Sequence, residues 1–151
     1  MRAWLPLVAL CWPLSGAWAD VLPPAEAPGV VASTDQAEVC GYADGQTYSQ
    51  RHRQTTAEMK HEAARDQRHC GEIDHRLPLS LGGADDVHNL WCQPGPPETW
   101  NFHLKDKVEV YVWQAVCKHH TMTLADGQAV FLSPDWRVAY CEFIGGPPCP
   151  P

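Results

Sequence analysis

Residues 72–91, EIDHRLPLSLGGADDVHNLW, decide the fold of this protein. The first part, EIDHRLPL, predicts a short strand that ends near Pro78, because proline cannot donate a hydrogen bond inside a central strand. The middle part, SLGGADDVH, predicts a turn in which Gly82 and Gly83 are free to take positive φ. NLWCQP predicts the return strand, which stops at Pro94. The stretch therefore predicts a β-hairpin.

An amphipathic helix is predicted to follow this hairpin. From Trp100 onward, apolar residues recur every four positions, the spacing that places them on one face of a helix. This face consists of Leu104, Val108, Val112 and Val116, with Tyr111 and Ala115 beside them. If the hairpin folds against the helix, four polar residues that span positions 74–103 come together: Asp74, His75, Asn89 and His103.

Three further helices are predicted around this unit. TTAEMKHEAARDQRH, residues 55–69, can be capped by Thr55 or Thr56, and its thin apolar stripe predicts a surface position. TLADGQAVFL, residues 123–132, begins with a pattern that resembles a capping box, although Gly127 weakens the interior. SPDWRVAYCEF, residues 133–143, offers Ser133 as a cap and a proline at the first helical position.

The ends of the chain are predicted to lie outside the folded domain. Residues 1–19 resemble a secretory signal peptide, with Arg2 before an apolar run and a small-x-small sequence before Asp20. Cys11 leaves a lipoprotein open as an alternative. Residues 20–37 predict a flexible leader rich in proline and alanine, residues 38–144 the domain, and residues 145–151 a tail rich in proline and glycine. We expect the protein to be exported to the periplasm or the cell exterior. We expect no stable membrane association after the signal peptide is removed.

The cysteine content supports export. Removal of residues 1–19 leaves six cysteines, and an even number in an exported chain predicts three disulfides, with 15 possible pairings. These are Cys40, Cys70, Cys92, Cys117, Cys141 and Cys149. A bridge between Cys70 and Cys92, at the two ends of the hairpin, is sterically natural, while the other pairings stay open. The absence of any CxxC pair argues against a zinc ribbon.

The net charge is unfavourable for tight binding of nucleic acid. It is −7 for the whole chain and −8 without residues 1–19, which contain one arginine and no acid. The charges are unevenly distributed, because residues 20–50 hold five acids and no base whereas residues 51–76 hold six bases and five acids. Phosphate binding usually depends on lysine and arginine, so weak and salt-sensitive binding is expected.

The order of these motifs resembles a known family. DH, followed by HNL and then WNFHLKD, is similar to the HNH (ββα-metal) nuclease motif. More narrowly, EIDHRLPLSLGGADDVHNLW together with KDKVE and DWRVAY resembles a group of small exported bacterial HNH-like proteins. The resemblance extends from about Cys70 to Tyr140. It implies an α+β fold with a ββα-metal core, additional helices and stabilising disulfides.

The resemblance also implies roles for individual residues. His75 would be the general base, because an imidazole titrates near neutral pH and can take a proton from water. Asp74 and His103 would bind one divalent metal ion, which would stabilise charge on the scissile phosphate. Asn89 would tie the turn together and help to orient His75. The ion would be Mg²⁺ or Mn²⁺, with Zn²⁺ or Ni²⁺ as alternatives.

Three further residues are expected near the phosphate or behind the metal ligands. Lys105 is placed to contact a phosphate, Glu72 could orient a ligand, and Arg76 is grouped with them. Taken singly, each of these polar residues also has an ordinary explanation as solvated surface, turn chemistry or a helix-end contact. Their occurrence together, in order, favours a site.

The function predicted on this basis is an exported endonuclease that cuts DNA, and possibly RNA, with little sequence preference. No element of the sequence resembles a reader of base edges. One alternative is a non-catalytic HNH-like module that binds a metal or a protein partner, whose identity the sequence leaves unknown. The other is a binding protein that is stabilised by disulfides and unrelated to nucleases.

Overall fold

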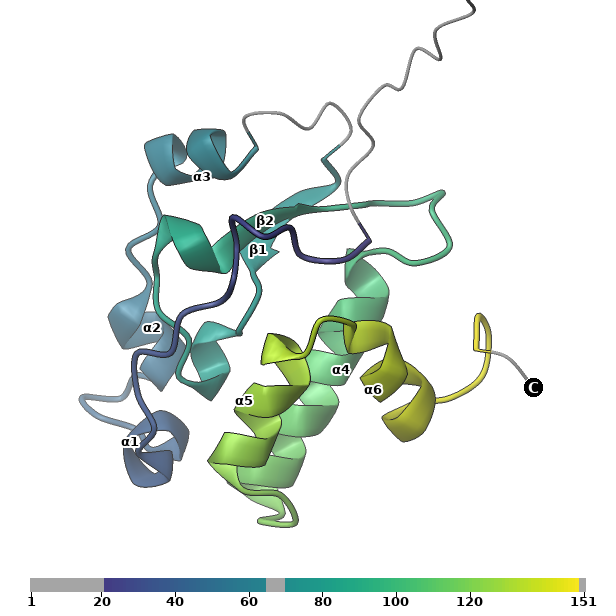
Figure 1. Ribbon diagram of the computed structural model, residues 1–151. Coiled ribbons are helices and arrows are strands. Elements are labelled where there is room, and N and C mark those ends of the chain that lie inside the picture. Colours follow the sequence, from purple (N-terminus) through teal and green to yellow (C-terminus); the bar gives the residue numbers. More distant parts are fainter. Residues whose placement is uncertain (1–20, 65–69, 150–151) are drawn as a thin grey trace, which may run out of the picture.

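The predicted hairpin is present in the protein. In the computed structural model, which describes residues 21–64 and 70–149, strand β1 (Glu72–His75) pairs antiparallel with β2 (Leu90–Gln93). The register places Glu72 opposite Gln93 and His75 opposite Leu90. Within the described residues this is a two-stranded sheet among helices (Figure 1), so the α+β class is confirmed.

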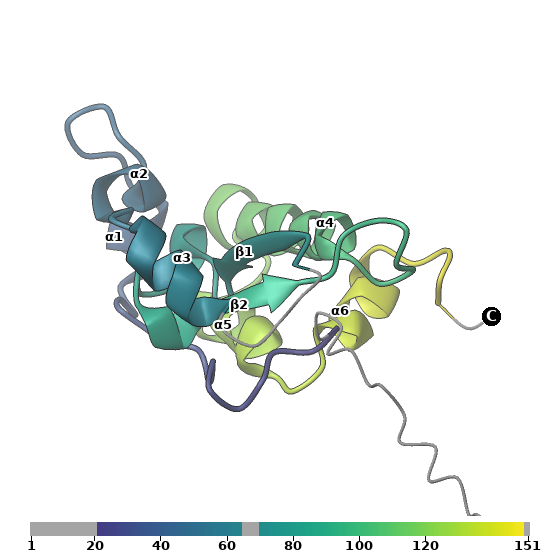
Figure 2. The same cartoon turned by 90° about the horizontal axis from the view of Figure 1, so that it is seen from above.

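Helices and short helical turns form the rest of the described chain. In chain order they are α1 (Gln36–Cys40), α2 (Tyr48–His52), α3 (Ala57–Ala63), the 3₁₀ turns η1 (Leu79–Leu81) and η2 (Val87–Asn89), α4 (Phe102–Trp113), the π-helical turn η3 (Gln114–Lys118), α5 (Leu124–Leu132) and α6 (Trp136–Phe143). Viewed from above, α4 and α6 lie on one side of the hairpin, and α1 to α3 lie towards the other (Figure 2).

The two glycines of the turn serve different purposes. Gly82 has φ +80°, the left-handed conformation that glycine adopts without steric cost. Gly83 does not have a positive φ, which corrects the prediction for this residue. A Cβ atom at Gly83 would lie 2.1 Å from the carbonyl oxygen of Leu77. Gly83 is therefore required by the close approach of two backbone segments.

The apolar face of helix α4 forms part of the hydrophobic core, as the spacing of its apolar residues predicts. It begins after Asn101, whose side chain accepts a hydrogen bond from the amide of His103. Val108 and Val112 are fully buried, as is Val116 in η3, where the helix widens into a π-turn. This apolar face packs with the residues Val39, Tyr48, Leu77, Leu81, Leu124, Phe131, Trp136, Ala139 and Tyr140.

The other predicted helices are present with one change of cap. Thr56 caps α3, which has no buried residue and is a surface helix. The predicted extension over residues 65–69 lies outside the described residues. Thr123 caps α5 by accepting from the amide of Asp126. Asp135, not Ser133, caps α6, because its carboxylate accepts a hydrogen bond from the amide of Arg137.

The segment 21–37 is part of the fold, which corrects the prediction of a flexible leader up to residue 37. Ala27 is 2% exposed, and Val31 forms a β-bridge with Gly83. The indole of Trp136 donates a hydrogen bond to the carbonyl of Val21. These contacts are made mostly by the backbone, and a composition rich in proline and alanine does not reveal them.

Three disulfides join the described chain. They are Cys40–Cys117, Cys70–Cys92 and Cys141–Cys149, with Cα–Cα distances of 5.1, 5.2 and 5.5 Å. The predicted Cys70–Cys92 bridge is confirmed, and Cys149 attaches the tail to α6. Three disulfides fit an oxidising, exported environment.

Two predictions about the beginning of the chain cannot be compared with this fold. The proposed signal peptide, residues 1–19, and Cys11 within it lie outside the described residues. Among the helices that are described, none has both the length and the apolar composition needed to cross a membrane.

Candidate functional site

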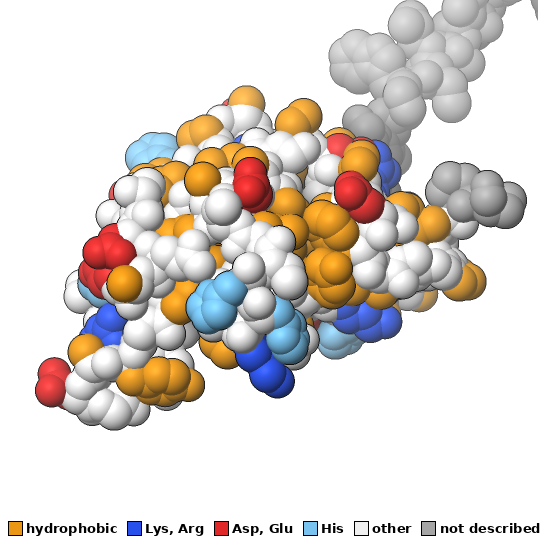
Figure 3. Space-filling view, turned by 90° about the horizontal axis from the view of Figure 1, so that it is seen from below, with side chains coloured by type: hydrophobic (Ala, Val, Ile, Leu, Met, Phe, Trp, Pro, Cys, Tyr) orange, Lys and Arg blue, Asp and Glu red, His pale blue; other side chains and the backbone are white. Residues whose placement is uncertain are grey.

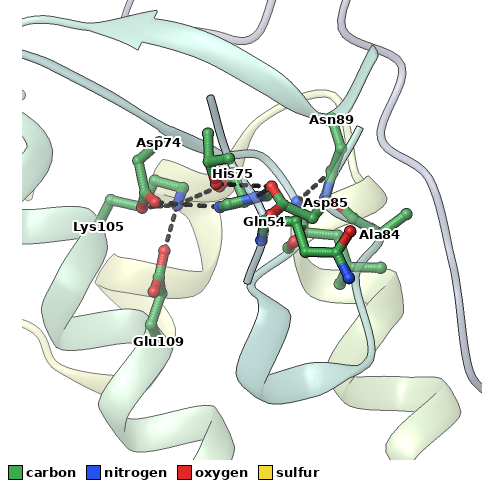
Figure 4. Close-up of polar contacts among 10 residues, drawn as sticks. Gln54, Asp74, His75, Ala84, Asp85, Asn89, Lys105 and Glu109 are labelled. Atoms are coloured by element: carbon green, nitrogen blue, oxygen red, sulfur yellow. Dashed lines mark hydrogen bonds and ion pairs between the residues drawn. The ribbon is translucent and has the colours of Figure 1, made fainter. Parts of the chain in front are cut away.

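The site is built around the last two residues of β1. His75 is 2% exposed, and both nitrogens of its ring face a carboxylate. Nδ1 lies 3.4 Å from Oδ1 of Asp74, and Nε2 lies 2.8 Å from Oδ1 of Asp85 (Figure 4). The side chain of Asp74 is 23% exposed and that of Asp85 is 5% exposed.

Asp85, in the turn before η2, is a site residue that the sequence did not reveal. Its carboxylate also accepts hydrogen bonds from the hydroxyl of Thr55, at 2.7 Å, and from the backbone amide of Gln54. Burial alone would raise the pKa of Asp85, but these hydrogen bonds and the one to His75 together lower it. Asp85 is therefore an ionised acceptor that connects His75 to the segment between α2 and α3.

Lys105 is buried against the same strand, which corrects the prediction that it contacts a phosphate. Its side chain is 2% exposed. The ammonium group donates to the carbonyl of His75 at 2.9 Å, forms an ion pair with Glu109, and lies 3.7 Å from Oδ2 of Asp74. Lys105 therefore joins α4 to the end of β1 and is not available to a ligand in this arrangement.

Three carboxylates gather around this lysine. Asp74 from β1 and Asp106 and Glu109 from α4 each offer an oxygen, and these oxygens lie within 4.8 Å of one another. We call these three residues the acidic cluster. Asp106 and Glu109 were not among the predicted ligands, although they belong to the KDKVE motif and their i, i+3 spacing places them on one face of a helix.

The pKa values within the acidic cluster differ with the environment of each group. Burial raises the pKa of Glu109 to about 7, and the negative charges of Asp74 and Asp106 act in the same direction against the ammonium of Lys105. Burial and the charge of Asp74 also raise the pKa of Asp106. For Asp74, the hydrogen bond from His75 and the charge of Lys105 outweigh burial and lower the pKa. The cluster thus has more negative charge than its one ammonium group balances.

His103 is not one of the three residues of the acidic cluster, and the predicted ligand pair of Asp74 and His103 stays a prediction. Its side chain is exposed, in the first turn of α4, and its ring lies against that of Phe102 at a centroid distance of 4.1 Å. His103 is near enough to Asp106 to counteract, in part, the rise in the pKa of that carboxyl group. In the described structure, the carboxylates of α4 that meet Asp74 are those of Asp106 and Glu109.

Asn89 ties the turn together, as predicted, from a fully buried position. Its side-chain oxygen accepts from the amide of Leu77 at 2.9 Å and from that of Val30 at 3.4 Å. Its side-chain nitrogen donates to the carbonyls of Leu77 and Ala84. Asn89 thereby holds the backbone on both sides of the turn that follows His75, and its contact with the site is indirect.

The two remaining predicted residues have different surroundings. Glu72 is an exposed residue of β1 that lies at the edge of the acidic cluster. Partial burial of its carboxyl group and the negative charges of Asp74 and Asp106 raise its pKa. Arg76 is 9% exposed. Its guanidinium donates to the backbone carbonyls of Ala27, Phe131, Leu132 and Ser133. Arg76 therefore has a structural role, which corrects its grouping with phosphate contacts.

A cavity of about 480 Å³ opens beside the acidic cluster. Asp106 and Glu109 form part of its wall on α4, and residues of α1, α2 and η1 form the opposite side. The side chains that line it include Tyr42, Tyr48, Val110 and Trp113. Two of the three clustered carboxylates are thus reached from a hollow in the surface.

The surface carries no obvious basic track on the face seen from below. Figure 3 shows lysine and arginine side chains separated from one another there, among apolar, acidic and histidine side chains.

No protein-family model, curated protein or solved structure matches the chain. The assignment of function therefore depends on the geometry of the site and on the motif resemblance.

Proposed function

We propose that this protein is an exported, metal-dependent endonuclease of the HNH type, with β1, β2 and α4 as its ββα-metal core. The observation that carries the proposal is the meeting of Asp74, from β1, with Asp106 and Glu109, from α4, beside the imidazole of His75. This arrangement combines a site for a hard cation with a group that can accept a proton, the two requirements of phosphodiester hydrolysis.

The donor set of the acidic cluster fits a divalent cation. Its donors are three carboxylate oxygens, the ligand type that Mg²⁺ and Mn²⁺ prefer, whereas Zn²⁺ and Ni²⁺ more often take nitrogen or sulfur ligands. Burial and the repulsion between the carboxylates raise the pKa values of Glu109 and Asp106, and a cation bound there would stabilise their ionised forms. When bound, the ion would polarise the scissile phosphate and stabilise the charge that develops on it.

His75 is the group that we propose to accept the proton of the attacking water. Its Nδ1 faces Asp74, the member of the acidic cluster nearest to the ring, and Nε2 is directed to Asp85. Lys105 binds the carbonyl of His75 and thereby fixes the backbone at this position. The chain thus holds the ring through two carboxylates and the backbone of His75 through Lys105 before a substrate arrives, so little reorganisation is needed at the reaction step.

The proposed substrate is DNA, and possibly RNA, bound without sequence preference. The net charge of −7 and the separated basic side chains in Figure 3 favour weak binding that declines steeply with salt. Export to the periplasm or the cell exterior is part of the proposal, because three disulfides require an oxidising compartment.

A plasmid-cleavage assay tests this function. We expect the oxidised protein to cut plasmid DNA with Mg²⁺ or Mn²⁺, to stop when EDTA is added, and to lose at least about 100-fold in rate on His75→Ala, the usual contribution of a general base. The matched control is His88→Ala, because His88 also pairs with an aspartate at 2.8 Å but is 67% exposed. Asp106→Asn should weaken activation by Mn²⁺ more than His103→Ala does.

A non-catalytic module that binds metal or protein is the second candidate. The burial of both His75 and Lys105 favours it, because a ring and an ammonium group that are 2% exposed have limited access to a substrate. Binding of Mn²⁺ that is lost on Asp106→Asn, without any cutting of DNA or RNA by the wild-type protein, would decide for this candidate.

A further inference from the structure

The cavity beside the acidic cluster lies between two walls that a disulfide joins. One wall belongs to α4 and η3, and the other to α1, α2, the loop between them and η1. The Cys40–Cys117 bridge connects α1 with η3, and Cys40 itself lines the cavity. Because its walls are linked covalently, the hollow exists before a ligand enters, and binding there requires little ordering of the chain.

The wall of α4 and η3 leads from the acidic cluster to an aromatic side chain. Five of its residues line the cavity at spacings of three or four, which places them along one helix face. They are Asp106, Glu109, Val110, Trp113 and Gln114. At a rise of about 1.5 Å per residue, Trp113 lies about 10 Å beyond Asp106 along the helix axis. This span corresponds to about three steps between stacked bases, at roughly 3.4 Å each, so a short stretch of nucleic acid can reach both ends.

Apart from the two carboxylates, the lining combines aromatic rings with uncharged polar groups. The rings include those of Trp113 and of Tyr42, which is 71% exposed. In the described part of the chain, the hydroxyl of Ser80 and the side-chain amide of Gln114 make no hydrogen bond, so both are available to a ligand. A nucleobase matches this lining, because its faces stack on aromatic rings and its edge carries donors and acceptors. A purely apolar ligand would leave the hydroxyl and the amide without partners.

The charges of the lining determine where a phosphate can lie. The described residues around the cavity include the carboxylates of Asp106 and Glu109 and no lysine or arginine. These carboxylates repel a phosphate unless the acidic cluster holds a cation. Binding of a nucleotide should therefore depend on a divalent ion, with the phosphate near the ion and the base near the aromatic end.

The size of the cavity distinguishes an unpaired nucleotide from a duplex. Its volume of about 480 Å³ falls within the range of about 300–1,000 Å³ that is usual for small organic ligands. A paired base is stacked inside the double helix and presents only its edge in a groove. A base must therefore leave the stack to contact the rings of this cavity, which is easiest in a single strand.

We propose that this cavity binds one unpaired nucleotide of the substrate, with its base against Trp113 and Tyr42, so that the protein acts preferentially on single-stranded DNA. The preference in cleavage rests on the proposed nuclease function. Binding of a nucleotide can be measured without any cleavage.

Binding is tested by calorimetry on the oxidised full chain. The probes are thymidine 3′,5′-bisphosphate, which has no internucleotide bond to cut, and the same compound with hydrogen in place of the base. With Mg²⁺, we expect the base to tighten binding about 10-fold, the usual size of one stacking contact, and EDTA to abolish binding. Trp113→Ala and Tyr42→Ala should each remove most of this gain and leave the affinity for the compound without a base unchanged. Tyr111→Ala is the control, because Tyr111 is a 41% exposed residue of α4 that does not line the cavity.

Cleavage is tested with a short DNA strand and with the duplex of the same sequence. We expect the wild type to cut the single strand at least about 10-fold faster, because the duplex must first unstack a base. Tyr42→Ala should slow cleavage of the single strand more than that of the duplex, whereas Tyr111→Ala should leave the ratio unchanged.

The possible outcomes separate this inference from the proposed function. Equal affinities for the two compounds, binding that persists in EDTA, or faster cleavage of the duplex would overturn the inference and leave the nuclease in place. A protein that cuts nothing, yet binds the compound with the base more tightly, would remove the nuclease and support the cavity as a nucleotide site. If Trp113→Ala does not fold, since Trp113 also packs against the core, Tyr42→Ala and Gln114→Ala decide: unchanged affinity in both overturns the inference.

Discussion

Asn89 is the residue on which the hairpin turn depends most directly. Its buried amide makes hydrogen bonds with the backbone of Val30, Leu77 and Ala84. We expect Asn89→Ala to lower the free energy of unfolding by about 3 kcal/mol, because each buried peptide group left without a partner costs roughly 1–3 kcal/mol. Urea unfolding followed by tryptophan fluorescence measures the change.

The control for Asn89→Ala is Asn101→Ala at the start of α4. Asn101 accepts one hydrogen bond at an exposed helix end, and loss of such a cap costs about 1 kcal/mol. Equal losses for the two variants would contradict the view that Asn89 holds the turn through several buried contacts.

Glu109 gives the stability of the protein a distinctive dependence on pH. Its pKa in the folded state is raised from 4.5 to about 7, so the folded protein binds more protons than the unfolded chain between these values. Without divalent ions, the free energy of unfolding should therefore fall as pH rises from about 4.5 to about 7. The lowered pKa of Asp74 has the opposite effect, but only at pH values below the ordinary range of aspartate.

Thermal melts of Glu109→Gln test this dependence on pH. The substitution removes the titrating group, so the decline in stability between about pH 4.5 and pH 7 should become shallower than in the wild type. Glu142→Gln, at an exposed position of α6, is the control and should leave the decline unchanged. A wild-type Tm that rises steadily across this range would be incompatible with the raised pKa of Glu109.

At the scale of elements, the contact of α5 with α4 and η3 depends on Gly127. A Cβ atom there would lie 2.9 Å from Cγ2 of Val116 and 3.0 Å from Cγ1 of Val112, both fully buried. Gly127→Ala should therefore lower the free energy of unfolding by about 1–3 kcal/mol through overpacking, although alanine is the better helix former by about 1 kcal/mol. Thermal unfolding shows whether Gly127→Ala lowers or raises Tm.

An exposed position of the same helix separates packing from helix propensity. Ala129→Gly on α5 should cost about 1 kcal/mol, the ordinary difference in propensity. If Gly127→Ala raised Tm, the packing of α5 against the valines would be looser than the structure indicates.

The elements that could be predicted from the sequence are those with a local signature. The period of four from Leu104 to Val116 indicated α4, because one face of this helix forms the core. Glycine and proline around residues 78–94 indicated the hairpin in the same way. No local sequence pattern indicated that segment 21–35 is part of the fold. Its conformation depends on backbone hydrogen bonds to residues far along the chain, such as those to Gly82.

The site was predictable to the extent that its residues are adjacent in sequence. Asp74 and His75 are neighbours on a strand end, and Asn89 lies in the turn, so their positions followed from the hairpin. Asp85 could not be distinguished from Asp86, because its partners Gln54 and Thr55 are about thirty residues away. Lys105 was expected to contact a phosphate, and its carboxylate partners on α4 and β1, which are distant or undistinguished in the sequence, account for its burial instead.

At the scale of the whole molecule, the Cys40–Cys117 disulfide connects α1 with η3 across 77 positions. In the chain-entropy account a bridge of this span stabilises the fold by about 4.5 kcal/mol, whereas one across 8 positions, such as Cys141–Cys149, contributes about 2.5 kcal/mol. Replacing both Cys40 and Cys117 by alanine should therefore lower Tm more than replacing Cys141 and Cys149. Calorimetry of the two double variants would reveal the opposite order if the tail bridge were the more important.

The guanidinium of Arg76 makes the hairpin dependent on distant parts of the chain. Its acceptors are carbonyls of residue 27 and of residues 131–133, before β1 and at the end of α5. A growing polypeptide that has not yet reached residue 131 lacks three of these four acceptors, so it cannot bury the guanidinium with all of its hydrogen bonds made.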